Sequence, residues 1–324
     1  MKGAKLLTGL LVSAAIAGCT EQPAGPTEES SEAQFKKVQE IEAVVEAPLT
    51  DYLLEVNRKL AAEGLGVALE KAEISYAPNA EPGRAHVLFA TDRTLRLTSR
   101  WVPGDARRLA DGDNLTYLNY GPLMTANGFI DAEPEVDDSF DTWAALSCNN
   151  LPLIKRPDQG VWPSAILTQN GVAGDPFVAD IVTIGFLPGF IFDLVLGPGA
   201  SNNVLGVTFT FIFGGFDSSG NFTPSDVDNN GRTDTALKEV WYNDAFAWTD
   251  TGTGDEIDIQ TVAFHENGHA LELGHFGRVA INLASGNLQV SPRAAMNAFI
   301  LGTLREPLGT DNASYCGNWA SWPN

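Results

Sequence analysis

One short window of the sequence gathers most of the chain's histidines. Residues 265–276 read HENGHALELGHF, so that His265, His269 and His275 lie close to Glu266. Positions four apart share one face of a helix, offset by about 40°, so the first two imidazoles project together. Zinc held by imidazoles acidifies water, and the neighbouring carboxylate of Glu266 is placed to take the proton. The spacing therefore predicts a zinc site that adds water to a carbonyl group, as in peptide hydrolysis.

The third histidine reaches the same ion only if the chain turns. On a straight helix His275 would point about 280° around the axis from His265. We expect the helix to end after His269, and glycine favours such a turn. Either Glu272 adopts the left-handed backbone conformation there, at a cost of about 1–2 kcal/mol, or the turn is displaced to Gly274. On an unbroken helix Glu272 would instead share the face of the first two histidines and become the third ligand.

The window resembles the zinc motif of metzincin proteases, in which three histidines bind zinc and a glycine makes the turn. The matrixin-like branch fits best, since SPRAAMNAF supplies Met296 for a methionine turn beneath the zinc, and Ala298 stands where other branches place tyrosine. The resemblance implies a zinc endopeptidase in which the three histidines hold the metal, Glu266 is the general base and Met296 binds no metal. It covers roughly residues 113–324, with its specific motifs in about 204–300.

The chain differs from the family at two positions, and one of its strands matches a family strand. Glu272 replaces the family glycine. NVLGVT resembles the edge strand that aligns substrate, which implies that a protein or peptide would lie extended along Leu205 and Gly206. Trp241 stands where matrix metalloproteases carry a histidine of a structural zinc site, so we expect no second zinc.

Other interpretations of the window stay open. The histidines could be incidental to a helix, although their spacing, Glu266 and Met296 argue against this. A zinc amidase could act on a non-protein bond. A non-catalytic envelope adhesin or structural lipoprotein could use the metal only for stability.

An acidic loop precedes the window. DVDNNGRTD presents oxygen ligands at Asp226, Asp228, Asn230 and Asp234, with glycine at the sharp turn, as in the first nine positions of an EF-hand loop. The twelfth position lacks the usual glutamate, and Glu239 two residues later could substitute. We expect a calcium ion here. The alternative is an acidic turn between strands.

The N-terminus is typical of a bacterial lipoprotein. Two lysines and an apolar stretch end in Ala-Gly-Cys, so residues 1–19 are predicted to be a signal peptide and Cys19 the lipidated residue. Residues 20–34 are rich in Pro, Glu and Ser and are predicted to form a tether. The expected location is the cell envelope, at the outer membrane or cell surface, with membrane attachment only through the lipid.

The two remaining cysteines, Cys148 and Cys316, are predicted to form a disulfide in that oxidising compartment. The alternatives are two buried thiols or a thiolate that caps the zinc.

The net charge of -21 excludes nucleic acid as a natural partner, because phosphates would repel this surface. We expect a monomer.

The sequence patterns of the elements that must position these residues predict an α+β fold. It would contain a twisted mixed sheet and an active-site helix. Residues 35–110 are expected to form a small α+β accessory or pro-region, and residues 111–324 the catalytic domain. His86 lies in a strand pattern and is expected to be structural. Helical periodicity marks residues 35–47, 49–64, 135–147 and 255–271. Strand patterns mark residues 67–77, 86–102, 114–120, 151–156, 203–213 and 239–248, and the apolar run 179–200 is expected to hold buried strands and loops.

Overall fold

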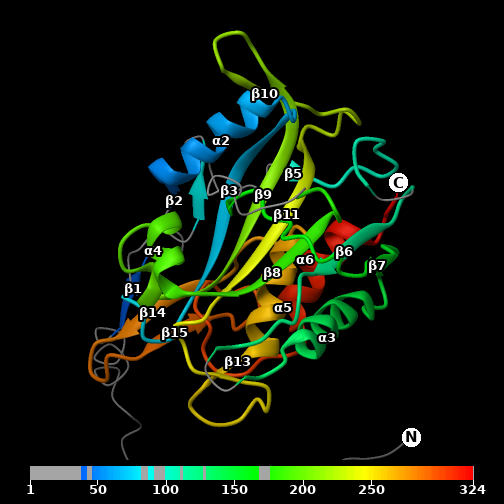
Figure 1. Ribbon diagram of the computed structural model, residues 1–324. Helices are drawn as coiled ribbons and strands as arrows, with labels where there is room; N and C mark the ends of the chain where they lie inside the picture. Colours follow the sequence, from blue (N-terminus) through cyan, green and yellow to red (C-terminus); the bar gives the residue numbers. More distant parts are fainter. Residues whose placement is uncertain are drawn as a thin grey trace, which may run out of the picture. The chain divides into compact units, whose positions relative to one another are not determined.

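A large mixed sheet forms the centre of the protein (Figure 1). The computed structural model describes residues 38–41, 46–81, 87–90, 99–109, 112–126, 129–167 and 176–323. The main path of the sheet runs through β2 (Glu46–Pro48), β4 (Val87–Phe89), β3 (Val67–Tyr76), β9 (Val204–Phe216), β11 (Thr233–Asn243), β8 (Ile181–Leu187), β6 (Leu115–Asn119) and β7 (Leu153–Lys155). Two short strands extend it, β10 (Phe222–Pro224) on β9 and β5 (Ser99–Arg100) on β11.

The remaining strands form two small sheets. One contains β1 (Val38–Ile41), β14 (Arg278–Asn282) and β15 (Leu288–Ser291), and the other contains β12 (Trp248–Thr249) and β13 (Ile257–Asp258). The helices are α2 (Asp51–Glu63), α3 (Glu133–Ala144), α4 (Gly189–Leu196), α5 (Ile259–Ala270) and α6 (Gly309–Trp319), with a 3-10 turn at Ala200–Asn202. The α+β class predicted from the sequence is therefore confirmed.

Strand direction is uniform from β6 to β11 and alternates from β11 through β9 and β3 to β4. β6, β8 and β11 run parallel, whereas β9 runs antiparallel to β11, and β3 runs antiparallel to β9. Each face of the sheet buries its own apolar core. Residues of α2 and α4 contribute to one core, and residues of α3, α5 and α6 contribute to the other. In Figure 1 these two groups of helices lie on opposite sides of the sheet. α5, which carries the histidine window, therefore packs on one face of the central strands.

Local sequence signals account for several elements. α2 begins after Thr50, whose side chain accepts from the Leu53 N–H, and ends at Gly64 with φ 69°. Both are preferred capping residues. α3 has proline in its first turn and buries Val136, Phe140 and Trp143 along one face, as its helical spacing predicts.

Two predicted elements are wrong. In the segment expected to be a helix at 35–47, the described residues form β1 and β2, because β2 finds a parallel partner in β4. In the run 179–200, β8 is followed by helix α4 in place of a second strand. Pro188 lies at the start of α4, where its missing N–H costs nothing. In both cases tertiary packing overrides local preference.

The predicted boundary near residue 110 does not separate two compact units. Residues Gln39–Asn324 form one unit, and β3 lies inside the sheet between β4 and β9. The expected accessory region therefore supplies a strand to the centre of the expected catalytic region. The predicted signal peptide, the tether and His86 lie outside the described residues, and Cys19 with them.

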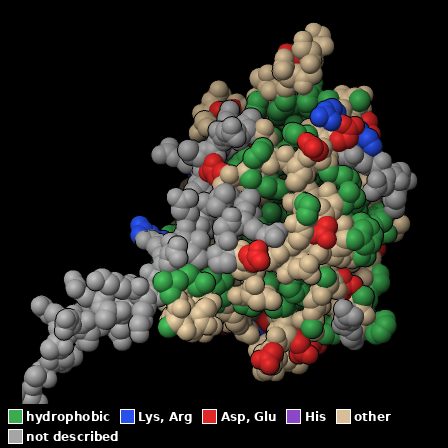
Figure 2. Space-filling model, turned by 90° about the vertical axis from the view of Figure 1, so that its left-hand side faces the viewer, with side chains coloured by type: hydrophobic (Ala, Val, Ile, Leu, Met, Phe, Trp, Pro, Cys, Tyr) green, Lys and Arg blue, Asp and Glu red, His purple; other side chains and the backbone are tan. Residues whose placement is uncertain are grey.

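A disulfide joins Cys148 to Cys316, with the Cα atoms 5.6 Å apart. It connects the chain that follows α3 to α6, and it confirms the pairing predicted from cysteine parity. In the described part of the chain, no helix combines the length and apolar character needed to cross a membrane. On the face in Figure 2, acidic side chains lie scattered among apolar and neutral polar ones.

Candidate metal centre

Side chains fix both ends of helix α5. Asp258 caps the N-terminus and accepts from the Thr261 N–H at 3.0 Å. At the other end, the indole of Trp101 donates to the carbonyl of Ala270 at 3.1 Å, and the indole of Trp319 donates to the next carbonyl at 3.0 Å. These last carbonyls have no partner inside a helix, so the two tryptophans stabilise its end and its orientation.

The helix ends in a Schellman turn at the position where the sequence carries glutamate. The Leu273 N–H donates to the Gly268 carbonyl at 2.9 Å, and the Glu272 N–H donates to the His269 carbonyl at 3.0 Å. Glu272 itself has φ 67°, the left-handed conformation that this turn requires. The turn therefore lies at Glu272, and its expected alternative at Gly274 is wrong.

Buried contacts compensate the unusual backbone of Glu272. Its Oε1 accepts from the Thr235 hydroxyl at 2.7 Å, and its carbonyl accepts from the Asn318 amide at 3.0 Å. Burial raises the pKa of Glu272, while the nearby Lys238 ammonium and the Thr235 hydrogen bond lower it. The carboxylate points to these partners and is not part of the histidine cluster, so the alternative in which Glu272 is the third ligand is wrong.

The turn brings the three predicted histidines together. The Nε2 atom of His269 lies 3.0 Å from that of His265 and 3.2 Å from that of His275. One ligand atom from each of the three lies within 4.8 Å of the others. On the far side of each of the first two rings, Nδ1 contacts a carbonyl, that of Ala295 for His265 and that of Leu273 for His269, both at 2.7 Å. These contacts fix the rings with Nε2 toward the common centre.

The donor set fits zinc. Tetrahedral bonds of about 2.0–2.1 Å place two ligand nitrogens about 3.3 Å apart, close to the observed Nε2 separations. Burial lowers the pKa of His265 to about 4 and that of His269 well below its usual range. Both rings are therefore neutral near pH 7, which is the form that binds a metal ion.

Glu266 is completely buried beside the histidines. Oε1 accepts from the Ser75 hydroxyl at 2.5 Å, and Oε2 accepts from the Thr208 hydroxyl at 2.7 Å. Burial raises the pKa of Glu266 to about 8, although both hydroxyls act in the opposite direction. Gly206 packs against this carboxylate, since a Cβ there would lie 2.7 Å from Oε1.

Met296 packs against helix α5 at Gly268. A Cβ at Gly268 would lie 2.4 Å from the Met296 sulfur, so only glycine fits between His265 and His269 of α5. The Met296 N–H donates to Asp311, and its carbonyl accepts from the Phe276 N–H at 2.8 Å. The methionine segment therefore supports the turn that carries His275.

Charged residues lie buried beside the histidine cluster. Lys238 on β11 donates to the Thr210 hydroxyl at 2.8 Å and to the His269 carbonyl at 3.3 Å. Burial, together with the nearby Lys71 charge and against the effect of Glu272, lowers the pKa of Lys238 to about 8. On β3, Lys71 pairs with Glu73 at 3.0 Å, and Glu73 lies 3.5 Å from Nδ1 of His269.

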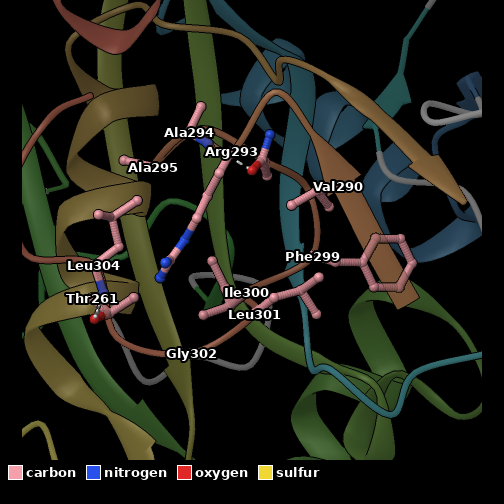
Figure 3. A pocket seen from close by; sticks show the side chains of 11 residues that line it. Thr261, Val290, Arg293, Ala294, Ala295, Phe299, Ile300, Leu301, Gly302 and Leu304 are labelled. Carbon is pink, nitrogen blue, oxygen red and sulfur yellow. Dashed lines mark hydrogen bonds between the residues drawn. The ribbon is translucent and has the colours of Figure 1, made fainter. Parts of the chain in front are cut away.

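A cavity of about 20 Å³ lies beside α5, against the segment that follows β15. Figure 3 shows the Arg293 side chain between Leu304 and Ile300, with Thr261 of α5 nearby. Arg293 donates to the Thr303 carbonyl at 2.9 Å. A volume of this size holds about one water molecule and no peptide side chain.

The acidic loop brings part of its predicted calcium ligands together. One carboxylate oxygen from each of Asp226, Asp228 and Asp234 lies within 4.8 Å of the others. The Asn230 amide donates to Asp228 at 2.9 Å, and Asp234 accepts from Arg107 at 2.7 Å. Arg107 therefore already neutralises part of the acidic charge, and calcium stays a prediction.

Glu239 of β11 does not serve as the calcium ligand considered for it. Glu239 is buried and accepts from Ser164 at 2.5 Å and from the Trp241 indole at 2.7 Å, so it is not a ligand of the acidic loop. Burial raises its pKa to about 7. Trp241 is a core residue that packs on Phe209.

The structure also corrects the expected peptide-binding strand. β9 is not an edge strand, because β3 pairs with it on the side opposite β11. Ser75 and Thr208, which hold Glu266, were not predicted from the sequence. Their only signal is a polar residue at a buried position of a strand, which they share with Lys71, Glu73 and Thr210.

The chain matches no known protein-family model, and a search of curated proteins found no relative of it.

Proposed function

We propose that the protein is a zinc-dependent endopeptidase, anchored by a lipid at Cys19 in the bacterial cell envelope. The observation that carries the proposal is the convergence of the Nε2 atoms of His265, His269 and His275. Glu266 lies next to His265 on helix α5. A zinc ion bound there would acidify water and polarise a carbonyl oxygen. The metzincin resemblance of the window, Met296 and the turn supports the same chemistry.

The chain's own residues would perform the proton steps. His265 and His269 are held neutral by burial and oriented through Nδ1, so they present fixed ligands. Glu266 would take a proton from the attacking water at its carboxylate and donate it to the amide nitrogen that leaves. Its pKa, raised to about 8, helps it to hold the proton between these steps, whereas taking the first proton requires the ionised carboxylate, the minority form near pH 7.

A second candidate is a metal-stabilised envelope lipoprotein without catalysis. The complete burial of Glu266 and the hydrogen bonds to both of its oxygens favour it, because a general base must reach water. In this case the zinc would act only by joining α5 to the segment that carries His275.

Metal analysis and a peptide-library assay separate the two candidates. We expect about one zinc per chain, Glu266-dependent hydrolysis, and loss of hydrolysis with retained zinc in Glu266→Gln. Glu256→Gln, which removes an exposed acid in the loop before α5, is the matched control. Hydrolysis that survives in Glu266→Gln refutes the proposed mechanism, and zinc binding without any Glu266-dependent hydrolysis supports the structural role.

A further inference from the structure

The strand β9 has no free edge beside the metal centre. Gly206 of β9 has Tyr242 of β11 as its Cα partner on one side and Ser75 of β3 on the other. An extended peptide that binds by strand addition needs such an edge. In this structure β3 occupies it.

The end of β3 is held from a second side as well. The Tyr76 N–H donates to the Ala298 carbonyl at 2.8 Å, and the Ile300 N–H donates to the Tyr76 carbonyl at 3.0 Å. Tyr76 therefore forms a parallel bridge to Phe299 while it pairs with Val204 of β9. Its backbone is bound between β9 and the Phe299 segment in the way that an extended peptide is bound in a groove.

The same segment covers the candidate general base. The Ser75 hydroxyl contacts Oε1 of Glu266 at 2.5 Å, and Gly206, the Cα partner of Ser75, packs against that carboxylate. The residue paired with Gly206 thus lies directly at the carboxylate. As long as that residue is Ser75, no substrate backbone can take the position.

The two faces of β3 differ in character. Leu69, Ile74 and Tyr76 belong to the apolar core under α2 and α4. The residues that face α5 are polar and include Glu73 and Ser75, which contact His269 and Glu266. Buried polar contacts hold two elements together less strongly than apolar packing does. β3 is therefore bound more firmly to α2 than to the helix of the metal centre.

We propose that residues 74–77 of β3 occupy the peptide-binding position of the metal centre, so that the fold described here is a latent form. Substrate gains access when this end of β3 leaves β9 and the Phe299 segment. The inference rests on the proposed peptidase function and adds its regulation. An exposed turn at Pro78 and Asn79 follows β3 directly, so a cut there would free the strand end.

A cut variant and a lock variant test the proposal in the full mature chain. The cut variant carries the recognition site of a sequence-specific protease between Pro78 and Asn79. The lock adds Ile74→Cys and Val207→Cys, which are Cα partners on the face away from α5. We expect cutting to raise peptide hydrolysis about tenfold or more, because the competent fraction rises. The oxidised lock should abolish that gain and reduction should restore it. The two single cysteine variants and reduced wild type are the controls.

Equal hydrolysis by locked and unlocked protein would overturn the proposal, because β3 would then stay in place during turnover. A second readout needs no activity. Hydrogen exchange at residues 75–77 should accelerate on cutting relative to β8, and the lock should restore protection. Unchanged protection in the cut protein would overturn latency by itself. Faster exchange without any Glu266-dependent hydrolysis would instead refute the proposed peptidase while leaving the release of β3 established.

Discussion

Replacing Glu272 with glycine tests whether its buried side chain outweighs the strain in its backbone. The residue has φ 67°, which costs an L-residue about 1–2 kcal/mol relative to glycine. Glycine would remove this cost, although it loses about 0.5–1 kcal/mol through the entropy of the unfolded chain. From the backbone alone, Glu272→Gly would leave the free energy of unfolding unchanged or raise it slightly.

The buried contacts of the Glu272 side chain predict the opposite effect, a lower free energy of unfolding in Glu272→Gly. Glu272 is 2 % exposed, accepts from the Thr235 hydroxyl at 2.7 Å and interacts with the fully buried Lys238. Removing a buried carboxylate from its hydrogen-bond donor and from the neighbourhood of a buried cation costs about 3–5 kcal/mol, because the Lys238 charge stays in a dry site. After the backbone gain is subtracted, we expect Glu272→Gly to lower the free energy of unfolding by about 2–4 kcal/mol.

Urea denaturation of zinc-saturated protein measures this difference, with Glu272→Gln as the control. Gln keeps an oxygen for Thr235 and the left-handed backbone but lacks the charge near Lys238. Its loss of stability should therefore come from the electrostatic part alone. Both variants should keep full zinc content, since Glu272 is not a ligand. A Glu272→Gly protein as stable as wild type would refute the compensation, and a loss of zinc would return Glu272 to the ligand set.

Four further predictions concern other parts of the protein. His275→Ala should lose its zinc on dialysis, measured by mass spectrometry, while the matched exposed-site variant Asn287→Ala keeps it. Burial raises the pKa of Glu239 to about 7 from an ordinary value near 4.5. Between these two values the unfolded chain releases a proton that the folded chain retains, so stability falls as pH rises, by up to about 1.4 kcal/mol per pH unit. Glu239→Gln should flatten that part of the pH profile in urea denaturation. Calcium should bind the acidic loop weakly, with a Kd of about 10⁻⁴–10⁻³ M by calorimetry, and Asp228→Asn should abolish the heat. Replacing Cys148 and Cys316 by serine should lower the free energy of unfolding by about 5 kcal/mol, because the disulfide closes a long loop.

Each of these has an outcome that contradicts it. Zinc retained in His275→Ala would mean that two histidines suffice. Parallel pH profiles for wild type and Glu239→Gln would show that Glu239 does not keep its proton. No calcium heat in wild type would leave the acidic turn as the correct interpretation of the loop. A small effect of the cysteine replacement would show that the unfolded chain is already compact there.

The site was predictable where its signals are local. The spacing of His265 and His269 defines one helix face, and the need for a turn before His275 follows from helix geometry alone. Cysteine parity sufficed for the disulfide. Even the position of the turn was foreseen as one of the alternatives, because Glu272 stands where a left-handed residue is required.

Long-range pairing was not predictable in the same way. The strand pattern of residues 67–77 is plain, but its partner is more than a hundred residues away, and nothing local identifies β9. The helical periodicity of 35–47 failed for a related reason, since the parallel contact between β2 and β4 decides the conformation there. An edge strand and a central strand share the same alternation, so the sequence could not show that β9 is covered.

Ser75 and Thr208, the buried polar residues of β3 and β9 that contact Glu266, connect the fold to the proposed function. A central strand gains nothing from placing Ser75 or Thr208 inside, because apolar residues would pack there without hydrogen-bonding needs. Both hydroxyls are explained once Glu266 is included, since a buried carboxylate requires donors. Thr208 would keep its contact in an open site, whereas Ser75 belongs to the strand that leaves in the proposed opening. Departure of β3 therefore frees one oxygen of Glu266 for water while the other stays oriented, so opening the site and preparing its base would be a single event.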